Sequence, residues 1–159
     1  MKKDLKYSFL EAKDKIEAYC AYQERCHDEV NQKLFSWGVD EEDRNALMAN
    51  LIENNFLNEE RFVYTFISGK VNIKKWGKRK IMFGLKAKKI PESIISKALS
   101  DVDEEVYMNN LESLAEKKWK EKTGSFYQKK AKVSNYLYQR GYEGELISEV
   151  LKGIIENDD

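Results

Sequence analysis

The chain has 159 residues, of which 42% are hydrophobic and 35% are charged, and its formal net charge at pH 7 is zero. It holds one proline, eight glycines and two cysteines. Two cysteines do not make a disulfide framework, no apolar run is long enough to span a bilayer, and no apolar signal region follows Met1. We therefore expect a cytoplasmic protein, not a membrane protein, built from long amphipathic helices.

Three helices are expected in residues 1–56. The first is predicted from about Lys6 to Arg25, the second is expected to end at Gly38, and the third to run from Asp40 to Asn54. The apolar stripe of the first helix consists of Phe9, Ala12, Ile16, Tyr19 and Ala21. Because these positions recur at helical spacing, they are expected to face a core.

A second group of three helices is expected in residues 57–101. Asn58 is a good N-cap for the first of them, and a connector is predicted from Gly69 to Gly77. Pro91 is expected in the first turn of the last helix, where its missing N–H costs nothing.

The third group is expected in residues 102–159. It begins with Asp101-Val102-Asp103-Glu104, which is typical of a capping box with Asp as the cap. A break is predicted at Thr123-Gly124-Ser125, and Gly141 is expected to end the second helix of this group.

A short cassette of two apolar residues, a helix end and one further apolar residue occurs three times, at spacings of 51 and 52 residues. Its copies are Val30-xxx-Leu34-xxx-Gly38-Val39, Ile81-xxx-Leu85-xxx-Lys89-Ile90 and Val133-xxx-Leu137-xxx-Gly141-Tyr142. A repeat of this length is typical of an array of small helical units. The sequence therefore predicts an all-α protein of three tandem three-helix repeats. The middle copy lacks the glycine that favours a left-handed helix end.

Charge is distributed unevenly along the chain. No acid occurs from Arg61 to Pro91, whereas acids gather on either side. A local positive field attracts polyanions or acidic protein surfaces even when the net charge is zero. The candidate binding residues in this basic middle are Lys70, Lys74, Lys75, Trp76, Lys78, Arg79, Lys80, Lys86, Lys88 and Lys89.

Two features of this charge pattern have alternative interpretations. Trp76 could stack on a base among its lysines, but packing in the joint between two helices is favoured because Trp buries well. A second basic run contains Lys117, Lys118, Lys120, Lys122, Lys129, Lys130 and Lys132, interrupted by Glu121. This run could extend the same surface or form the outer face of a long helix.

The residue patterns of the common enzyme classes are absent. The chain has one histidine, His27, beside Cys26, and adjacent side chains on a helix point about 100° apart, which disfavours a nucleophile pair. No phosphate-binding glycine motif and no Cys/His metal spacing occur. We expect His27 at a helix start or on the surface, both cysteines packed, and no cofactor, metal or enzymatic activity.

Four stretches of the sequence resemble the RecX family of regulatory proteins. They are Tyr22 to Leu34, Leu57-Asn58-Glu59-Glu60-Arg61-Phe62, Gly77 to Ile90, and Tyr136-Leu137-xx-Arg140-Gly141-Tyr142. Their order and spacing are more specific than any one of them. The sequence departs from the family pattern at Cys26-His27, Asn58, Gly84 and Lys89.

The resemblance implies an elongated, curved array that modulates the recombinase RecA, generally as an inhibitor of filament growth. It implies binding to the RecA–DNA filament and to single- or double-stranded DNA, and roles in homologous recombination, DNA repair and the SOS response. We expect a monomer. The two alternatives are a stand-alone DNA-binding helical-repeat protein and a helical adaptor for another protein. Helix-turn-helix reading of bases is disfavoured because the segment from Ile94 to Leu99 is largely apolar.

Overall fold

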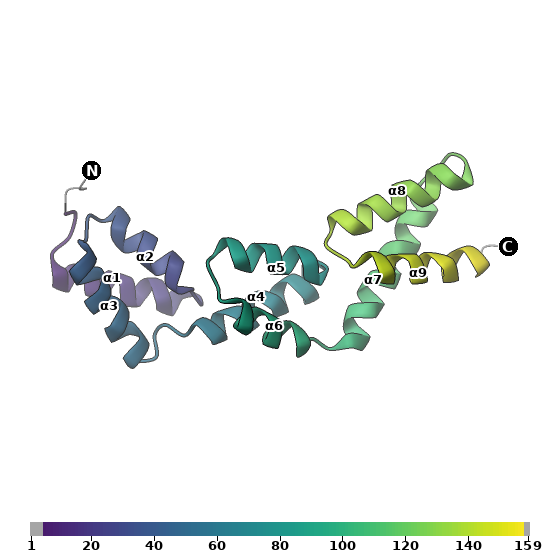
Figure 1. Ribbon diagram of the computed structural model, residues 1–159. Helices are drawn as coiled ribbons and strands as arrows, with labels where there is room; N and C mark the ends of the chain where they lie inside the picture. Colours follow the sequence, from purple (N-terminus) through teal and green to yellow (C-terminus); the bar gives the residue numbers. More distant parts are fainter. Residues whose placement is uncertain (1–4, 158–159) are drawn as a thin grey trace.

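The computed structural model describes residues 5–157, so residues 1–4 and 158–159 of the first and third predicted repeats lie outside the described residues. Over residues 5–157 the chain forms nine α-helices and no strand. The helices are α1 (Phe9–Tyr22), α2 (His27–Ser36), α3 (Glu41–Glu53), α4 (Glu59–Asn72), α5 (Lys78–Ala87), α6 (Glu92–Ser100), α7 (Glu104–Glu121), α8 (Phe126–Gln139) and α9 (Gly144–Asn157). Figure 1 shows them as three groups of three in an elongated row. The predicted all-α repeat array is therefore confirmed.

Each group of three helices has its own hydrophobic core, and helices pack mainly within their group. The cassette residues Leu34, Leu85 and Leu137 are fully buried, one in each core. The predicted boundaries at 56/57 and 101/102 stay predictions, since Leu57 packs in the first core and Val102 contacts both the second and the third.

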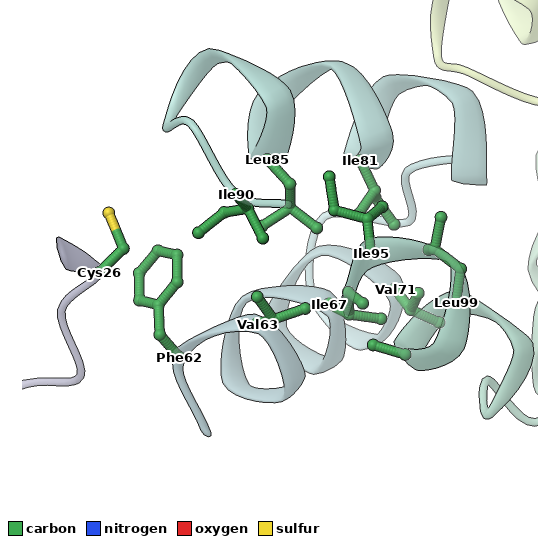
Figure 2. Close-up of a cluster of buried hydrophobic side chains, with 11 residues drawn as sticks. Cys26, Phe62, Val63, Ile67, Val71, Ile81, Leu85, Ile90, Ile95 and Leu99 are labelled. Atoms are coloured by element: carbon green, nitrogen blue, oxygen red, sulfur yellow. The ribbon is translucent and has the colours of Figure 1, made fainter. Parts of the chain in front are cut away.

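The second core also receives a residue from the first group. Cys26, which precedes α2, is fully buried and packs with the second core, and Figure 2 shows it beside Phe62 of α4. The remaining core residues come from α4, α5, α6 and the α5–α6 turn, which contributes Ile90, and they include Val63, Ile67 and Val71 at spacings of four along α4. The first joint of the array therefore contains a buried thiol as well as surface contacts.

All three cassettes end their helices in the same way. The ninth residue of the cassette, which ends the helix, is left-handed in every copy, with φ of 79° at Gly38, 61° at Lys89 and 102° at Gly141. The next residue donates its N–H across the turn: Val39 to the carbonyl of Leu34, Ile90 to that of Leu85, and Tyr142 to that of Leu137, each at 3.2 Å. This 6→1 bond defines the Schellman motif. Lys89 thus adopts the left-handed conformation that glycine has in the other two copies.

Several predicted details were wrong. Helix α4 continues through Gly69 to Asn72, because Val71 extends its buried face, so the connector is only residues 73–77. Helix α1 is shorter than expected, and its buried face is Ala12, Ile16 and Cys20, whereas Phe9 and Ala21 are exposed.

Two helix starts also differ from the prediction. Pro91 occupies the N-cap position of α6, one residue before the first turn. The cap of α7 is Asp103, whose carboxylate accepts the N–H of Glu105 and of Val106. Asp101 instead ends α6 and accepts the hydroxyl of Tyr64 at 2.5 Å.

Candidate nucleic-acid interface

Helix α5 begins with three cations, Lys78, Arg79 and Lys80, and contains no acid. The N-terminal end of a helix carries a partial positive charge, so cations there are unfavourable by about 0.3–1 kcal/mol each. The N-cap, Gly77, contributes no side-chain cap. A helix start that contradicts the usual charge preference is a candidate functional feature.

The start of α5 is capped by the third group of helices. Gly77 donates its N–H to the carbonyl of Arg140 at 2.8 Å, and Arg79 donates to the carbonyl of Gly141 at 2.9 Å. The N–H of Lys78 is satisfied by the hydroxyl of Tyr107 at 2.8 Å. These backbone groups have no partner inside a helix. The turn between α8 and α9 therefore positions the cations of α5.

The connector before α5 is held by the same neighbours. The guanidinium of Arg140 donates to the carbonyls of Lys74 and Lys75, and the hydroxyl of Tyr142 donates to Lys75 at 2.8 Å. Lys75 itself is left-handed, with φ of 57°, and its ammonium donates to the buried amide of Asn110 at 3.2 Å. The ammonium of Lys75 is thus already engaged within the protein.

Trp76 is partly buried and packs against the second core, as favoured from the sequence. The ammonium groups of Lys70 and Lys80 each lie 4.4 Å from the centroid of its ring. Such cation–π contacts contribute about 0.5–1 kcal/mol at exposed sites. Lys74 and Lys80 are both exposed.

Lys78 and Arg79 reach toward the third group. The ammonium of Lys78 lies 2.6 Å from the carboxylate of Glu104. The guanidinium of Arg79 lies 4.0 Å from the ring centroid of Tyr138 and donates to its hydroxyl at 2.9 Å. The first turn of α5 therefore contacts the last turn of α8, and Figure 1 shows these two helix ends near each other.

The other predicted site residues lie at the opposite end of α5. The ammonium of Lys88 is 3.2 Å from the carboxylate of Glu29, and that of Lys89 is 3.5 Å from Asp28. Lys86 lies 4.0 Å from Glu92. The structure therefore divides the ten candidate residues into two groups, and Lys88 and Lys89 belong to the joint between the first and second repeats.

This first joint contains two more polar pairs. Arg61 pairs with Glu24, and the ring of His27, which is the first residue of α2, lies 3.3 Å from Glu59. Part of the acid-free window is thus matched by acids of the first repeat. These pairs could not be predicted from the sequence, because their members lie 32 to 61 positions apart and no local pattern links them.

The second basic run covers the end of α7 and the start of α8. Lys118 pairs with Glu121 at 3.1 Å, and Lys132 donates to the carbonyl of Thr123 at 3.2 Å. The ammonium of Lys129 lies 4.3 Å from the ring of Trp119. This run therefore surrounds the tip of the α7–α8 hairpin, away from α5.

Both cysteines are packed, as predicted. Cys20 is 4% exposed and Cys26 is fully buried, and burial raises the pKa of each thiol to about 11. Because the thiolate is the reactive form, this shift disfavours a nucleophilic role for either thiol at neutral pH. Within residues 5–157, no cluster of His, Cys, Asp and Glu could hold a metal ion, and no helix is long and apolar enough to cross a membrane.

Comparison with known families assigns the chain to one of them. The family model described as the second three-helix domain of RecX matches residues 58–99, and that of the third three-helix domain matches residues 105–151. The chain belongs to the RecX family. The predicted resemblance is therefore confirmed.

Relatives named "Regulatory protein RecX" support this assignment. The chain is 32% identical to that of Chlorobaculum tepidum over 80% of this chain and 78% of the relative. It is 26% identical to that of Bacillus mycoides over 89% of this chain and 53% of the relative, and 28% identical to that of Clostridium perfringens strain 13 over 82% and 62%. The chain thus spans between half and two thirds of the length of the last two relatives.

Solved structures of the RecX family share the fold. The crystal structure of RecX from Lactobacillus salivarius matches with a TM-score of 0.83 and 22% sequence identity, over 91% of this chain and 95% of that one. A second RecX crystal structure matches with a TM-score of 0.82 and 21% identity.

The RecX motifs of this chain consist largely of packing positions. Phe62 is 6% exposed, and Ile81 and Leu85 are fully buried. Within the same motifs, Gly77 and Gly141 meet at the joint between the second and third repeats. The family motifs therefore account for the fold and do not mark an exposed contact surface.

Proposed function

We propose that this protein regulates RecA by binding the RecA–DNA filament and inhibiting its growth and activities. Membership of the RecX family, across both matched three-helix domains, is the observation that carries this proposal. The resemblance to that family implies RecA as the partner. The elongated row of helices also supports it, because such an array offers a long surface to a filament.

The proposed contact surface is the first turn of α5 with its connector. Lys74 and Lys80 are exposed there, and Arg79 lies beside them in a helix that has no acid. A filament that contains DNA presents phosphates, and cations bound to phosphates release counterions. Lys88 and Lys89 contribute less in this proposal, because acids of the first repeat already pair with them.

In this role the protein is a cytoplasmic, monomeric regulator without enzymatic activity that acts in homologous recombination, DNA repair and the SOS response. The buried thiols of Cys20 and Cys26 support a protein that works in a reducing compartment. The regulatory name of its RecX relatives supports a role other than catalysis.

Co-sedimentation with the cognate RecA filament tests partner binding. RecA assembled on single-stranded DNA with a slowly hydrolysed ATP analogue is pelleted with and without the protein. We expect the protein in the pellet, and less of a Lys74→Ala/Lys80→Ala variant. A Lys97→Ala/Lys152→Ala variant, which removes two exposed cations from α6 and α9, is the matched control. A protein that stays in the supernatant at all RecA concentrations contradicts the proposal.

One observation favours a second function, stand-alone DNA binding: neither α5 nor α8 contains an acid. In this case the protein binds DNA tightly without RecA and leaves RecA activities unchanged. The dependence of DNA affinity on salt distinguishes contact with phosphates from other modes. Tight, salt-dependent binding with no effect on RecA would favour this second function over the first.

A further inference from the structure

Helices α5 and α8 occupy equivalent places in the second and third repeats, and Figure 1 shows them along the same edge of the row. Among the helices of residues 5–157, these two alone contain no Asp or Glu. Their equivalent in the first repeat, α2, begins with Asp28 and Glu29. The equivalent helix of the first repeat is therefore not acid-free.

The outer side of α8 carries two exposed aromatic rings. Tyr127 is 81% exposed and Tyr138 is 52% exposed. Eleven residues return a helix to within about 20° of the same direction, so both rings lie on one face, about 17 Å apart along the axis. Lys130 lies one turn after Tyr127 and is also exposed. The face combines stacking surfaces with a cation.

The α8 face joins the first turn of α5 directly. Arg79 stacks on Tyr138, and Gly141, at the end of α8, lies against Lys80, since a Cβ at Gly141 would be 2.4 Å from the Cβ of Lys80. One turn further along α5 is Phe83, which is 75% exposed. We call the surface formed by Tyr127, Lys130, Tyr138, Arg79, Lys80 and Phe83 the α5–α8 track.

The chemistry of the track fits a single polynucleotide strand. Phosphates are attracted by its cations in the absence of carboxylates on either helix. Exposed rings add about 1–3 kcal/mol for each base that stacks on them, and this requires bases whose faces are open. In a duplex the faces are covered by neighbouring base pairs, so the rings would contribute little. Scattered exposed rings are common, but three on two adjoining acid-free helices are not explained by packing.

We propose that the α5–α8 track binds single-stranded nucleic acid, with bases stacked on Tyr127, Tyr138 and Phe83 and phosphates held by the adjoining cations. Of the second basic run, Lys130 belongs to the track, and α8 connects it to the α5 surface through the contact of Tyr138 with Arg79. The proposal rests on the proposed function only for its setting, in which the strand is the DNA inside the RecA filament. Binding itself needs no RecA.

Fluorescence anisotropy with a labelled thymidine 20-mer, and with a duplex of the same length, tests the track without RecA. We expect the wild type to prefer the single strand. Tyr127→Ala is expected to weaken single-strand binding about 5- to 150-fold, and Tyr127→Phe to leave it unchanged, because phenylalanine keeps the stacking face. Tyr127 is exposed, so neither change disturbs the core.

A charge test uses two matched double variants. Lys80→Ala/Lys130→Ala removes one cation from each helix of the track and is expected to lower the slope of log affinity against log salt by about 1.4, since each phosphate contact of a single strand contributes about 0.7. Lys97→Ala/Lys152→Ala also removes two positive charges, but from α6 and α9, outside the track. This variant is expected to keep the slope of the wild type. Wild-type affinity in Tyr127→Ala, equal losses in both double variants, or equal affinity for the duplex would overturn the proposal. A RecA effect without strand binding would overturn it and leave the proposed function standing.

Discussion

Gly77 and Gly141 meet backbone to backbone at the joint between the second and third repeats. A Cβ on Gly77 would lie 2.2 Å from the carbonyl carbon of Gly141 and from the nitrogen of Tyr142. The N–H of Gly77 donates to the carbonyl of Arg140, the residue before Gly141. The two backbone segments therefore cannot move apart without losing this hydrogen bond. Close backbone approach explains the need for glycine at both positions.

Gly77→Ala is therefore expected to destabilise the protein strongly, by about 2–4 kcal/mol, because the new methyl group meets backbone on the opposite side. The measurement is urea unfolding followed by circular dichroism. Gly69→Ala is the control: Gly69 lies inside α4, and a Cβ there would meet nothing within 4 Å. We expect that control to gain about 0.5–1 kcal/mol from helix propensity. Equal effects of the two changes would refute the tight joint.

Lys89 is expected to make the folded protein less stable than a glycine at this position would. Its φ of 61° is one that a residue with a Cβ adopts at a cost, while Gly38 and Gly141 adopt it freely. Lys89→Gly and Lys89→Ala both remove the ion pair with Asp28, so their difference isolates the backbone. We expect the glycine variant to be about 1 kcal/mol more stable than the alanine variant in urea unfolding. An alanine variant of equal stability would contradict the left-handed helix end.

The buried thiols predict a loss of stability at alkaline pH. The pKa of Cys20 and of Cys26 is raised to about 11 in the folded chain, from a model-compound value of 9.0, by desolvation. The unfolded chain then loses its thiol protons first, so the stabilisation is complete below pH 9 and is lost as pH rises toward 11. Each thiol contributes a slope of up to about 1.4 kcal/mol per pH unit.

Urea unfolding at pH 8, 9 and 10 measures this slope. We expect the free energy of unfolding to fall above pH 9 in the wild type and to fall less steeply in a Cys20→Ala/Cys26→Ala variant. Burial also raises the pKa of Tyr142 to about 12, so tyrosine ionisation adds to the slope mainly above pH 10. Identical slopes in both proteins between pH 9 and 10 would show that the thiols are not the cause.

The repeat architecture was predictable because it depends on local patterns. Apolar residues four apart, such as Ile81 and Leu85, and glycines at helix ends mark helices without knowledge of their neighbours. The basic middle was predictable for the same reason. Its division into two groups was not, since it depends on pairs such as Lys88–Glu29 that form only in the folded array.

The continuation of the surface into the third repeat also needed the structure. Arg79 and Tyr138 lie 59 positions apart, and only the packing of α5 against the α8–α9 turn brings them together. Lys89 shows a further limit of local patterns. Its lack of glycine suggested a lost helix cap, but the tertiary fold retains the left-handed conformation and the Schellman hydrogen bonds.

The most direct test of the proposed RecA regulation is steady-state ATP hydrolysis by the cognate RecA on single-stranded DNA, with this protein added at substoichiometric amounts. We predict that the rate falls progressively as filaments fail to grow, and that Lys74→Ala/Lys80→Ala inhibits less than Lys97→Ala/Lys152→Ala. An unchanged hydrolysis rate from substoichiometric to excess protein would contradict RecA regulation by this chain.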